Sequence, residues 1–340
     1  MGVVSASEQR VVLHVGLPKS GTTYLQGLLA PSRDRLREAG ILYPFVRPGA
    51  QFHGAVEIRG SHDKFGLSAA DVAGTWAALC ARARDFAGTT IISHEVLAGA
   101  SPDQVRTALE PLAGVDVHVV VTARDLGRQA VAHWQEEVKL GATYSFADFE
   151  RTQLRADAGP GGDRPHFWHA QDFADCLRRW SPGRSHLVVL PRPGAEPAEL
   201  WNRFAAAAGI DAAVIDPAGQ APANPSLGVA DIALLRAVNA GLDGRLDRGD
   251  YLRLVKREYA EGVLARRPGP RPRAPYDLRE VFEPATAAWL AQAERDGVEI
   301  HGDPGDLAPV LAAPGDRRPD DVELAEDPAD VIRRLAPRLR

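Results

Sequence analysis

This 340-residue chain has few cysteines, no long apolar run and no excess of positive charge. Its two cysteines, Cys80 and Cys176, are too few for a disulfide framework or a cysteine-based metal cluster, which favours a reducing compartment, the cytoplasm. No apolar run approaches the length of about 18 residues that can span a bilayer, and residues 1–10 lack the pattern of a secretory signal. The net charge of −5 offers no basic surface of the kind that binds nucleic acid.

Lysine is also scarce. The chain has 40 basic residues, and all but four of them are arginines; the lysines are Lys19, Lys64, Lys139 and Lys256. A lysine kept in an arginine-rich chain indicates a role for a compact point charge rather than for the planar fork of arginine. Lys19 is the lysine that lies in a motif.

The segment around Lys19 predicts a strand, a loop and a helix. Residues 11–15 are mostly apolar and β-branched, as in a buried strand. Residues 16–21 turn the chain, and from Thr22 onward the apolar residues have helical spacing. A glycine-bounded loop between a buried strand and a helix can hold a phosphate, because backbone N–H groups converge there and the helix N-terminus favours an anion.

The position of the lysine separates this loop from the loop of nucleoside-triphosphate enzymes, which reads G-x-x-x-x-G-K-[ST]. Gly16 and Gly21 have the required spacing, but Thr22 stands where that motif has its lysine. Lys19 comes two residues before Gly21. This order suits a donor without a β/γ-phosphate pair and without Mg²⁺, where the lysine itself reaches the bridging oxygen.

The string Lys19-Ser20-Gly21-Thr22-Thr23 resembles the 5′-phosphosulfate loop of the sulfotransferases that use 3′-phosphoadenosine-5′-phosphosulfate (PAPS). The resemblance extends over roughly the first 200 residues, with the loop as its specific motif. It implies that this string and Pro18 bind the donor, and that Tyr24 lies against the adenine. A packing role is the alternative for Tyr24.

A second segment resembles the part of the sulfotransferases that grips the 3′-phosphate. There an arginine after a strand is followed eight residues later by a serine, and Arg124 matches the arginine after the predicted strand 115–122. Ala132 stands at the place of the serine, so half of the clamp is missing. Arg128, one helical turn after Arg124, is the candidate for the missing contact, because a guanidinium binds phosphate through two bonds. The alternative for Arg124 is an ion pair with a neighbouring carboxylate.

Transfer of a sulfuryl group to a hydroxyl also needs a base with a pKa near the working pH. His94 and Glu95 follow the predicted strand 89–93. We favour His94 as the base, with Glu95 as its orienter or as the alternative base. His53, expected in a loop, is a third candidate. A purely structural role for these residues is the competing interpretation.

Strand and helix patterns alternate along the first 210 residues and predict parallel βαβ units of an α/β fold. The resemblance implies a P-loop-like three-layer arrangement with a central parallel sheet of about four or five strands. A further strand is expected at 186–190, and from residue 211 the chain reads as helical. We expect one domain over 1–312, with the sheet core at about 11–210 and a helical part at about 211–312, and then a charged, loose tail over 313–340. Helical patterns occupy 71–86, 102–112, 125–139, 199–208, 229–240, 251–265 and 278–296.

The resemblance thus implies a sulfotransferase that moves a sulfuryl group from PAPS to a hydroxyl or amine of a small-molecule, glycan or lipid acceptor, and we expect Lys19 to stabilise the leaving group. A P-loop kinase is one alternative. The missing lysine after Gly21 disfavours it, as does the lack of a clear Mg²⁺-binding aspartate, since Asp125 follows a strand only through Arg124. A non-catalytic nucleotide-binding protein on the same fold is the other, and Ala132 keeps it open.

No metal is expected. The remaining histidines show no spacing typical of metal ligands. His166 and His169 are three residues apart, but no third ligand is evident beside them. The others considered are His14, His62, His118, His133, His186 and His301.

Overall fold

The computed structural model describes residues 9–156, 164–180, 184–196, 198–218, 226–324 and 326–335. The chain forms two compact units. The first comprises residues 1–124, 170–221 and 286–308, and the second comprises residues 125–169, 222–285 and 309–340. Among the described helices, none combines the length and the apolar character that a bilayer crossing requires.

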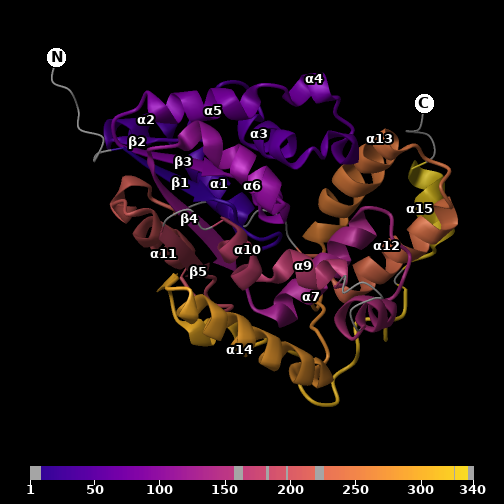
Figure 1. Cartoon of the computed structure of the whole chain (residues 1–340). Helices are drawn as coiled ribbons and strands as arrows, with labels where there is room; N and C mark the ends of the chain where they lie inside the picture. Colours follow the sequence, from indigo (N-terminus) through magenta and orange to yellow (C-terminus); the bar gives the residue numbers. More distant parts are fainter. Residues whose placement is uncertain are drawn as a thin grey trace. The chain divides into compact units, whose positions relative to one another are not determined.

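The first unit is built on a six-stranded parallel sheet with the strand order β2-β3-β1-β4-β5-β6 (Figure 1). The α/β class and the parallel sheet expected from the sequence are confirmed. The strands are β1 Arg10–His14, β2 Ile41–Leu42, β3 Thr89–Ser93, β4 Asp116–Ala123, β5 Arg184–Val189 and β6 Glu299–His301.

The four longer strands, β1, β3, β4 and β5, are the ones that the sequence predicts. The sheet has more strands than expected because the short strands β2 and β6 are added at its two edges. β2 has two residues and β6 has three, too few for an alternating or apolar pattern to be recognised. β6 also lies beyond residue 211, where the sequence indicates helices alone. The C-terminal part, expected to be helical, thus also contributes this short edge strand to the sheet.

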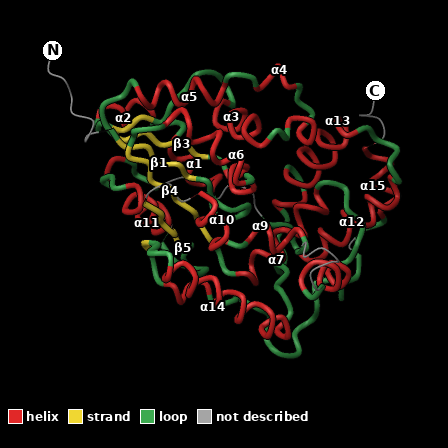
Figure 2. Tube along the Cα trace, viewed as in Figure 1, coloured by secondary structure: helices red, strands yellow, loops and turns green. Residues whose placement is uncertain are grey.

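Helices of the first unit flank the sheet, as the red segments around the yellow strands show (Figure 2). α11 packs on β5, and α10 packs on β4 and β5. The helices that lie wholly within this unit are α1 Thr22–Leu29, α2 Arg33–Glu38, α3 Ala50–Arg59, α4 Ala69–Val72, α5 Thr75–Arg84, α6 Pro102–Leu109, α10 Phe173–Trp180 and α11 Glu199–Ala208.

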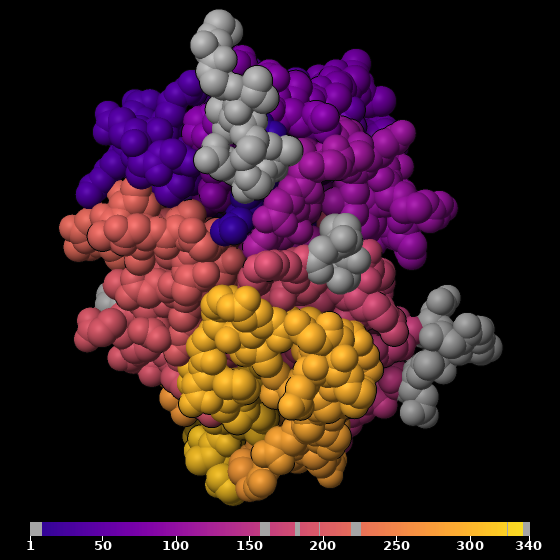
Figure 3. Space-filling view, turned by 60° about the vertical axis from the view of Figure 1, so that its left-hand side comes forward, coloured from indigo at the N-terminus to yellow at the C-terminus, as the bar shows by residue number. Residues whose placement is uncertain are grey.

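One face of the sheet is closed by a hydrophobic cluster that also holds α1. Val12, Val120 and Val188 come from three adjacent strands and point to this face. Leu25 and Leu29 of α1 and several aromatic and small residues of α11 complete the cluster. Figure 3 shows the salmon-coloured segment with α11 against the indigo segment with α1 and α2. The cluster fixes where the first turn of α1 points.

The direction in which the strands are added to the sheet reverses beside β1. The chain leaves β1 toward β2 and β3 on one side, whereas β4 and the strands after it lie on the other side. In open α/β sheets, ligands bind at the carboxyl ends of the strands where the chain direction reverses in this way. The loop after β1 and Arg124 after β4 both follow strands at this point.

The second unit is helical. Trp134 of α7 packs edge-to-face on Phe146 of α8, and Phe149 packs in the same way on Phe167. Asn239 of α12 donates hydrogen bonds to the Val138 and Ala142 carbonyls at the end of α7. The helices are α7 Leu126–Lys139, α8 Phe146–Phe149, α12 Val229–Leu242, α13 Arg248–Asp250, the π-helix η6 Tyr251–Glu261 and α15 Pro328–Leu335, while α9 His166–Gln171 and α14 Arg279–Arg295 cross the boundary between the units.

The charged C-terminal segment is packed within this unit over much of its described length, which differs from the loose tail expected. Asp320 accepts hydrogen bonds from the Phe146 and Ala147 N–H groups and pairs with Arg236. Val331 and Leu335 of α15 are buried. Residue 325 and residues 336–340 of the predicted tail lie outside the described residues.

The hydrophobic cluster predicts how strongly the first unit depends on α11. Phe204 is fully buried, and replacing it with alanine leaves a cavity in the cluster. We expect Phe204→Ala to lower the free energy of unfolding by about 3–5 kcal/mol, measured by urea denaturation. Phe45→Ala is the matched control, since Phe45 is 53% exposed, and it should cost much less. Equal losses for the two variants would contradict this account of the core.

Candidate functional site at the carboxyl edge of the sheet

The loop between β1 and α1 has a backbone conformation that only certain residues adopt. Its φ angles are +42° at Gly16, +64° at Lys19 and +83° at Gly21. A Cβ atom at Gly16 would lie 2.5 Å from Cγ2 of Thr22, and one at Gly21 would lie 2.6 Å from Cδ2 of Leu200. Both positions therefore require glycine, and the strand, loop and helix follow one another as the sequence predicts.

Lys19 carries the strain of this loop. Among the described residues, Lys19 and Asp243 are the two non-glycine residues with a positive φ. Such a conformation costs of the order of 1–3 kcal/mol and persists where the surrounding structure holds it in place, often at functional sites. The Lys19 side chain is half-buried. A charged residue held in a strained turn before a helix N-terminus is suited to contact an anion.

A line of buried hydrogen bonds fixes the loop to the sheet. The Ser20 hydroxyl donates to the Leu17 carbonyl at 2.6 Å, and its Oγ lies 2.6 Å from Oγ1 of Thr122. Thr122 Oγ1 lies 3.2 Å from Nε2 of His14, whose Nδ1 lies 2.8 Å from Oγ of Ser93. Ser20, Thr122, His14 and Ser93 are all fully buried.

These bonds join the ends of three adjacent strands, since His14 ends β1, Ser93 ends β3 and Thr122 lies near the end of β4. Burial, partly opposed by Glu95, lowers the pKa of His14 to about 4, so its ring is neutral at pH 7. The side chain of Ser20, a predicted donor contact, bonds internally. Its contribution is to hold the loop in shape.

The start of α1 has no side-chain cap. Its cap residue, Gly21, has no side chain that could accept a hydrogen bond from the first turn. The first N–H groups of a helix have no partners within the helix, and the dipole favours negative charge there. Thr22 is buried and Thr23 is exposed. Tyr24 packs against the hydrophobic cluster, which fits the packing role considered for it.

Glu95 is held as a carboxylate beside the loop. Gln26 of α1 donates to its Oε2 at 3.2 Å, and the Thr22 hydroxyl bonds to the same carboxyl group. Burial acts to raise the pKa of Glu95, but His94, the backbone, Gln26 and Thr22 together outweigh it and lower that pKa. The side chain remains 27% exposed. Glu95 is therefore an ionised, accessible group.

His94 lies beside Glu95 with one ring nitrogen occupied. Its Nδ1 accepts a hydrogen bond from the Val96 N–H at 3.2 Å and lies 3.8 Å from Oε2 of Glu95. Burial lowers the pKa of His94, although Glu95 opposes this. Because Nδ1 is an acceptor, the neutral ring carries its proton on Nε2. In this arrangement His94 is a donor at Nε2.

His53 lies in the helix α3 rather than in the loop expected, so that placement is corrected. The ring of Phe52 is 5.7 Å from that of His53 and 5.2 Å from that of His94, which brings both histidines to the same part of the unit. Nδ1 of His53 is buried without a hydrogen-bond partner. Burial and then Arg47 lower the pKa of His53.

Arg124 and Arg128 differ in their surroundings. Arg124 is half-buried directly after β4, in the first unit. Arg128 belongs to the second unit, where its guanidinium pairs with Asp125. The Asp125 carboxylate also caps α7 by accepting from the Arg128 N–H at 3.0 Å, and it accepts from the Val310 N–H at 2.9 Å. Asp125 is thus occupied by structural contacts.

The candidate residues drawn from the sequence motifs include neither His14 nor Gln26, although both contact residues of this site. A histidine within an otherwise apolar strand was the available signal for His14.

Comparison with protein-family models, with curated proteins and with solved structures finds no match for this chain. The arrangement brings the glycine-bounded loop with Lys19 and the carboxylate of Glu95 to one edge of the sheet.

The neutral state of His14 predicts how stability depends on pH. In the unfolded chain this histidine has its ordinary pKa of 6.5, and in the folded chain burial lowers that pKa to about 4. The unfolded state therefore binds more protons between these values, so stability is fully present above pH 6.5 and falls as the pH is lowered through this window. The contribution is about 3 kcal/mol at most.

We expect urea denaturation at a series of pH values to show this decline, and His14→Gln to show a shallower one. Part of the decline remains in the variant, because burial also lowers the pKa of His186 to about 4. The slopes are compared, so a general loss of stability in the variant does not affect the result. Identical slopes for both proteins would mean that His14 is not held neutral.

Proposed function

We propose that this protein is a sulfotransferase that uses PAPS as its donor. The observation that carries the proposal is the strained loop with Lys19, which follows β1 at the point where the direction of the sheet reverses. Its sequence, Lys19-Ser20-Gly21-Thr22-Thr23, is the one that resembles the phosphosulfate loop. Arg124, which follows the adjacent strand β4, would bind the 3′-phosphate.

In the reaction, the acceptor oxygen or nitrogen attacks the sulfur of the donor. A new bond to sulfur forms while the bond between sulfur and the bridging oxygen of the 5′-phosphosulfate breaks. Negative charge develops on that oxygen as adenosine 3′,5′-bisphosphate leaves, and Lys19 is the cation that would stabilise it. The acceptor proton passes to a base of the protein.

For the base, we favour Glu95 over His94, which reverses the preference drawn from the sequence. His94 accepts a hydrogen bond at Nδ1 and holds its proton at Nε2, so neither nitrogen offers a vacant lone pair. Glu95 is ionised and partly exposed, and its contacts with Gln26 and Thr22 hold it in place. His94 would then donate a hydrogen bond from Nε2.

The kinase alternative has less support. Asp125, the aspartate that would hold Mg²⁺, accepts hydrogen bonds from two backbone N–H groups and pairs with Arg128.

The acceptor is proposed only as a class: a small molecule, glycan or lipid with a hydroxyl or amine. The two free, buried cysteines fit the cytoplasmic location that the composition favours.

The role of Lys19 predicts a selective loss of rate. Removing one preorganised group that stabilises developing charge costs about 10²–10³ in kcat. We expect Lys19→Ala to lose that much in PAPS-dependent labelling of an acceptor found by a mass-shift screen, while adenosine 3′,5′-bisphosphate binds only moderately less well. Lys64→Ala is the matched control, since Lys64 is exposed in the short helix η1 (His62–Phe65), and it should behave as wild type.

A Lys19→Ala protein with full activity would show that Lys19 does not meet the leaving group. Loss of folding in this variant is separated from loss of catalysis by its melting temperature. A parallel loss of bisphosphate binding and rate would assign Lys19 to donor binding alone.

The identity of the base predicts where the rate falls with pH. A base must be unprotonated, and the pKa of Glu95 lies below 4.5 whereas that of His94 lies below 6.5. With Glu95 as the base, kcat/KM falls only in or below the acidic range of an ordinary carboxyl group, because the contacts of Glu95 lower its pKa, and Glu95→Gln loses about 10²–10⁴. His94→Gln then keeps the same profile.

Two results together would return the role of base to His94. One is a normal rate in Glu95→Gln; the other is a dependence of kcat/KM on pH that the wild type shows and His94→Gln lacks. Loss confined to His53→Ala would assign the base to α3 instead. The measurement is kcat/KM against pH for the wild type and these variants.

A further inference from the structure

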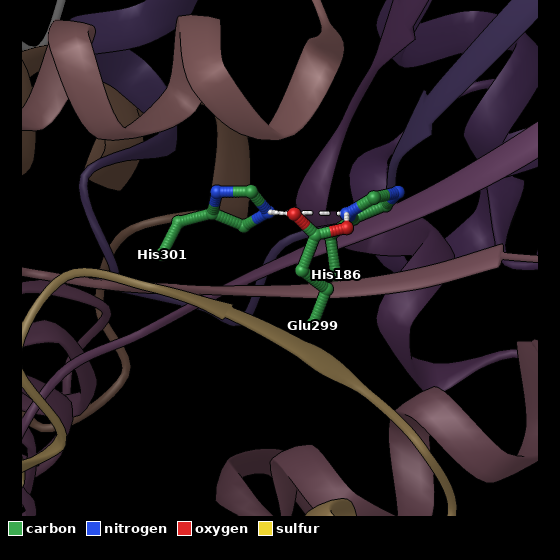
Figure 4. Close-up of side chains that lie close together, drawn as sticks. All are labelled: His186, Glu299 and His301. Carbon is green, nitrogen blue, oxygen red and sulfur yellow. Dashed lines mark hydrogen bonds and ion pairs between the residues drawn. The ribbon is translucent and has the colours of Figure 1, made fainter.

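Three histidines lie in a row across the edge of the sheet formed by β4, β5 and β6. Nδ1 of His118 lies 2.9 Å from Nε2 of His186, and Nδ1 of His186 lies 3.1 Å from Nε2 of His301. Glu299, two residues before His301 on β6, reaches both: its Oε2 is 3.4 Å from Nδ1 of His186 and its Oε1 is 3.6 Å from Nε2 of His301. Figure 4 shows the Glu299 carboxylate between the two rings.

The strand register explains this convergence. Glu299 pairs with His186, and His301 pairs with Val188, two residues further along β5. Paired residues of neighbouring strands, and residues two apart on one strand, point to the same face of a sheet. The sequence separation between β5 and β6 hides the group from any search for ligand spacing. For this reason, the metal-free expectation overlooks it.

The hydrogen bonds of His118 also determine which ring nitrogen of His186 carries the proton and which one has a lone pair for this group. Nε2 of His118 lies 3.1 Å from Oδ2 of Asp116, and a carboxylate can only accept, so His118 carries its proton on Nε2. Its Nδ1 must then accept from Nε2–H of His186. His186 therefore presents the lone pair of Nδ1 to His301 and Glu299, as a metal-binding imidazole supported by a carboxylate does.

The spacing of the three atoms fits a tetrahedral ion. Zinc binds imidazole nitrogen and carboxylate oxygen at about 2.0–2.2 Å, which separates tetrahedral ligands by roughly 3.3–3.6 Å. Here Nδ1 of His186 and Nε2 of His301 are 3.1 Å apart, while Oε2 of Glu299 lies 3.4 Å from the first and Oε1 lies 3.6 Å from the second. One ligand atom from each of the three residues lies within 4.8 Å of the other two.

We propose that Nδ1 of His186, Nε2 of His301 and the Glu299 carboxylate bind a zinc ion, with Asp116 and His118 orienting His186. Binding requires His301 to carry its proton on Nδ1. The Glu299 side chain is 64% exposed and that of His301 is 11% exposed, so solvent reaches the group and a water would complete the coordination as fourth ligand. Two imidazoles among three ligands favour zinc over Mg²⁺ or Ca²⁺.

This site is separate from the proposed donor site. β5 and β6 are the second and third strands from β1 in the sheet, and neighbouring strands lie about 5 Å apart. The zinc proposal therefore does not rest on the sulfotransferase proposal, and either can fail alone.

The test is calorimetric titration of the chelator-treated full chain with Zn²⁺. We expect one ion per chain for the wild type, and no measurable binding of Mg²⁺. His301→Ala and Glu299→Gln change ligands on the edge strand, and each should weaken Zn²⁺ binding by more than 100-fold. Asp116→Asn removes only the supporting carboxylate and should weaken it about 10–100-fold.

His169→Ala is the matched control, because His169 is exposed in α9 of the second unit and should leave Zn²⁺ binding unchanged. In addition, Co²⁺ bound to the wild type should show the visible absorption of a tetrahedral ion, and this band should be lost in His301→Ala. Absence of Zn²⁺ binding by the wild type would overturn the proposal. So would wild-type affinity in folded His301→Ala and Glu299→Gln variants.

Discussion

The candidate site depends on the buried hydrogen bonds that run from Ser20 through Thr122 and His14 to Ser93. They join the loop to three neighbouring strands, and each of these side chains is fully buried. A buried polar group without a partner costs free energy, so each member of the line constrains the next. This constraint is what keeps a backbone with left-handed turns at Gly16, Lys19 and Gly21 in one conformation.

In the same arrangement, the buried residues hold the loop in place, and different, partly exposed residues are available for chemistry at the edge of the sheet. Ser20 and His14 face inward and hold the loop, whereas Lys19 and Glu95 are partly exposed. α1 connects the two sets of residues, since its apolar side packs in the hydrophobic cluster while Thr22 and Gln26 bond to Glu95. The proposed chemistry therefore uses a cation and a carboxylate that are positioned by one short helix and its preceding loop.

Much of the first unit could be predicted from the sequence, because its elements leave local patterns. The strand 89–93 and the helix 199–208 were predicted at their observed bounds, and β1, β4 and β5 were predicted within a few residues. β2 and β6 were not, because two or three residues carry no periodicity. His53 was expected in a loop because the pattern of α3 is weak, with glycine and polar residues inside it.

The candidate site was predictable where a contiguous motif carries it, as at Lys19-Ser20-Gly21, and not where strands bring distant residues together. The contacts of His14 with Ser93 and Thr122, and of His186 with His301 and Glu299, arise from strand register alone. The division of the chain after Arg124, which assigns Arg128 to the second unit, likewise has no local signal in the sequence.

The most direct test of the central claim is equilibrium binding of adenosine 3′,5′-bisphosphate, compared with ATP and Mg²⁺, to the wild-type chain. The account predicts tight binding of the bisphosphate with a raised melting temperature and a weaker effect of ATP; stabilisation by ATP and Mg²⁺ with none by the bisphosphate would contradict it.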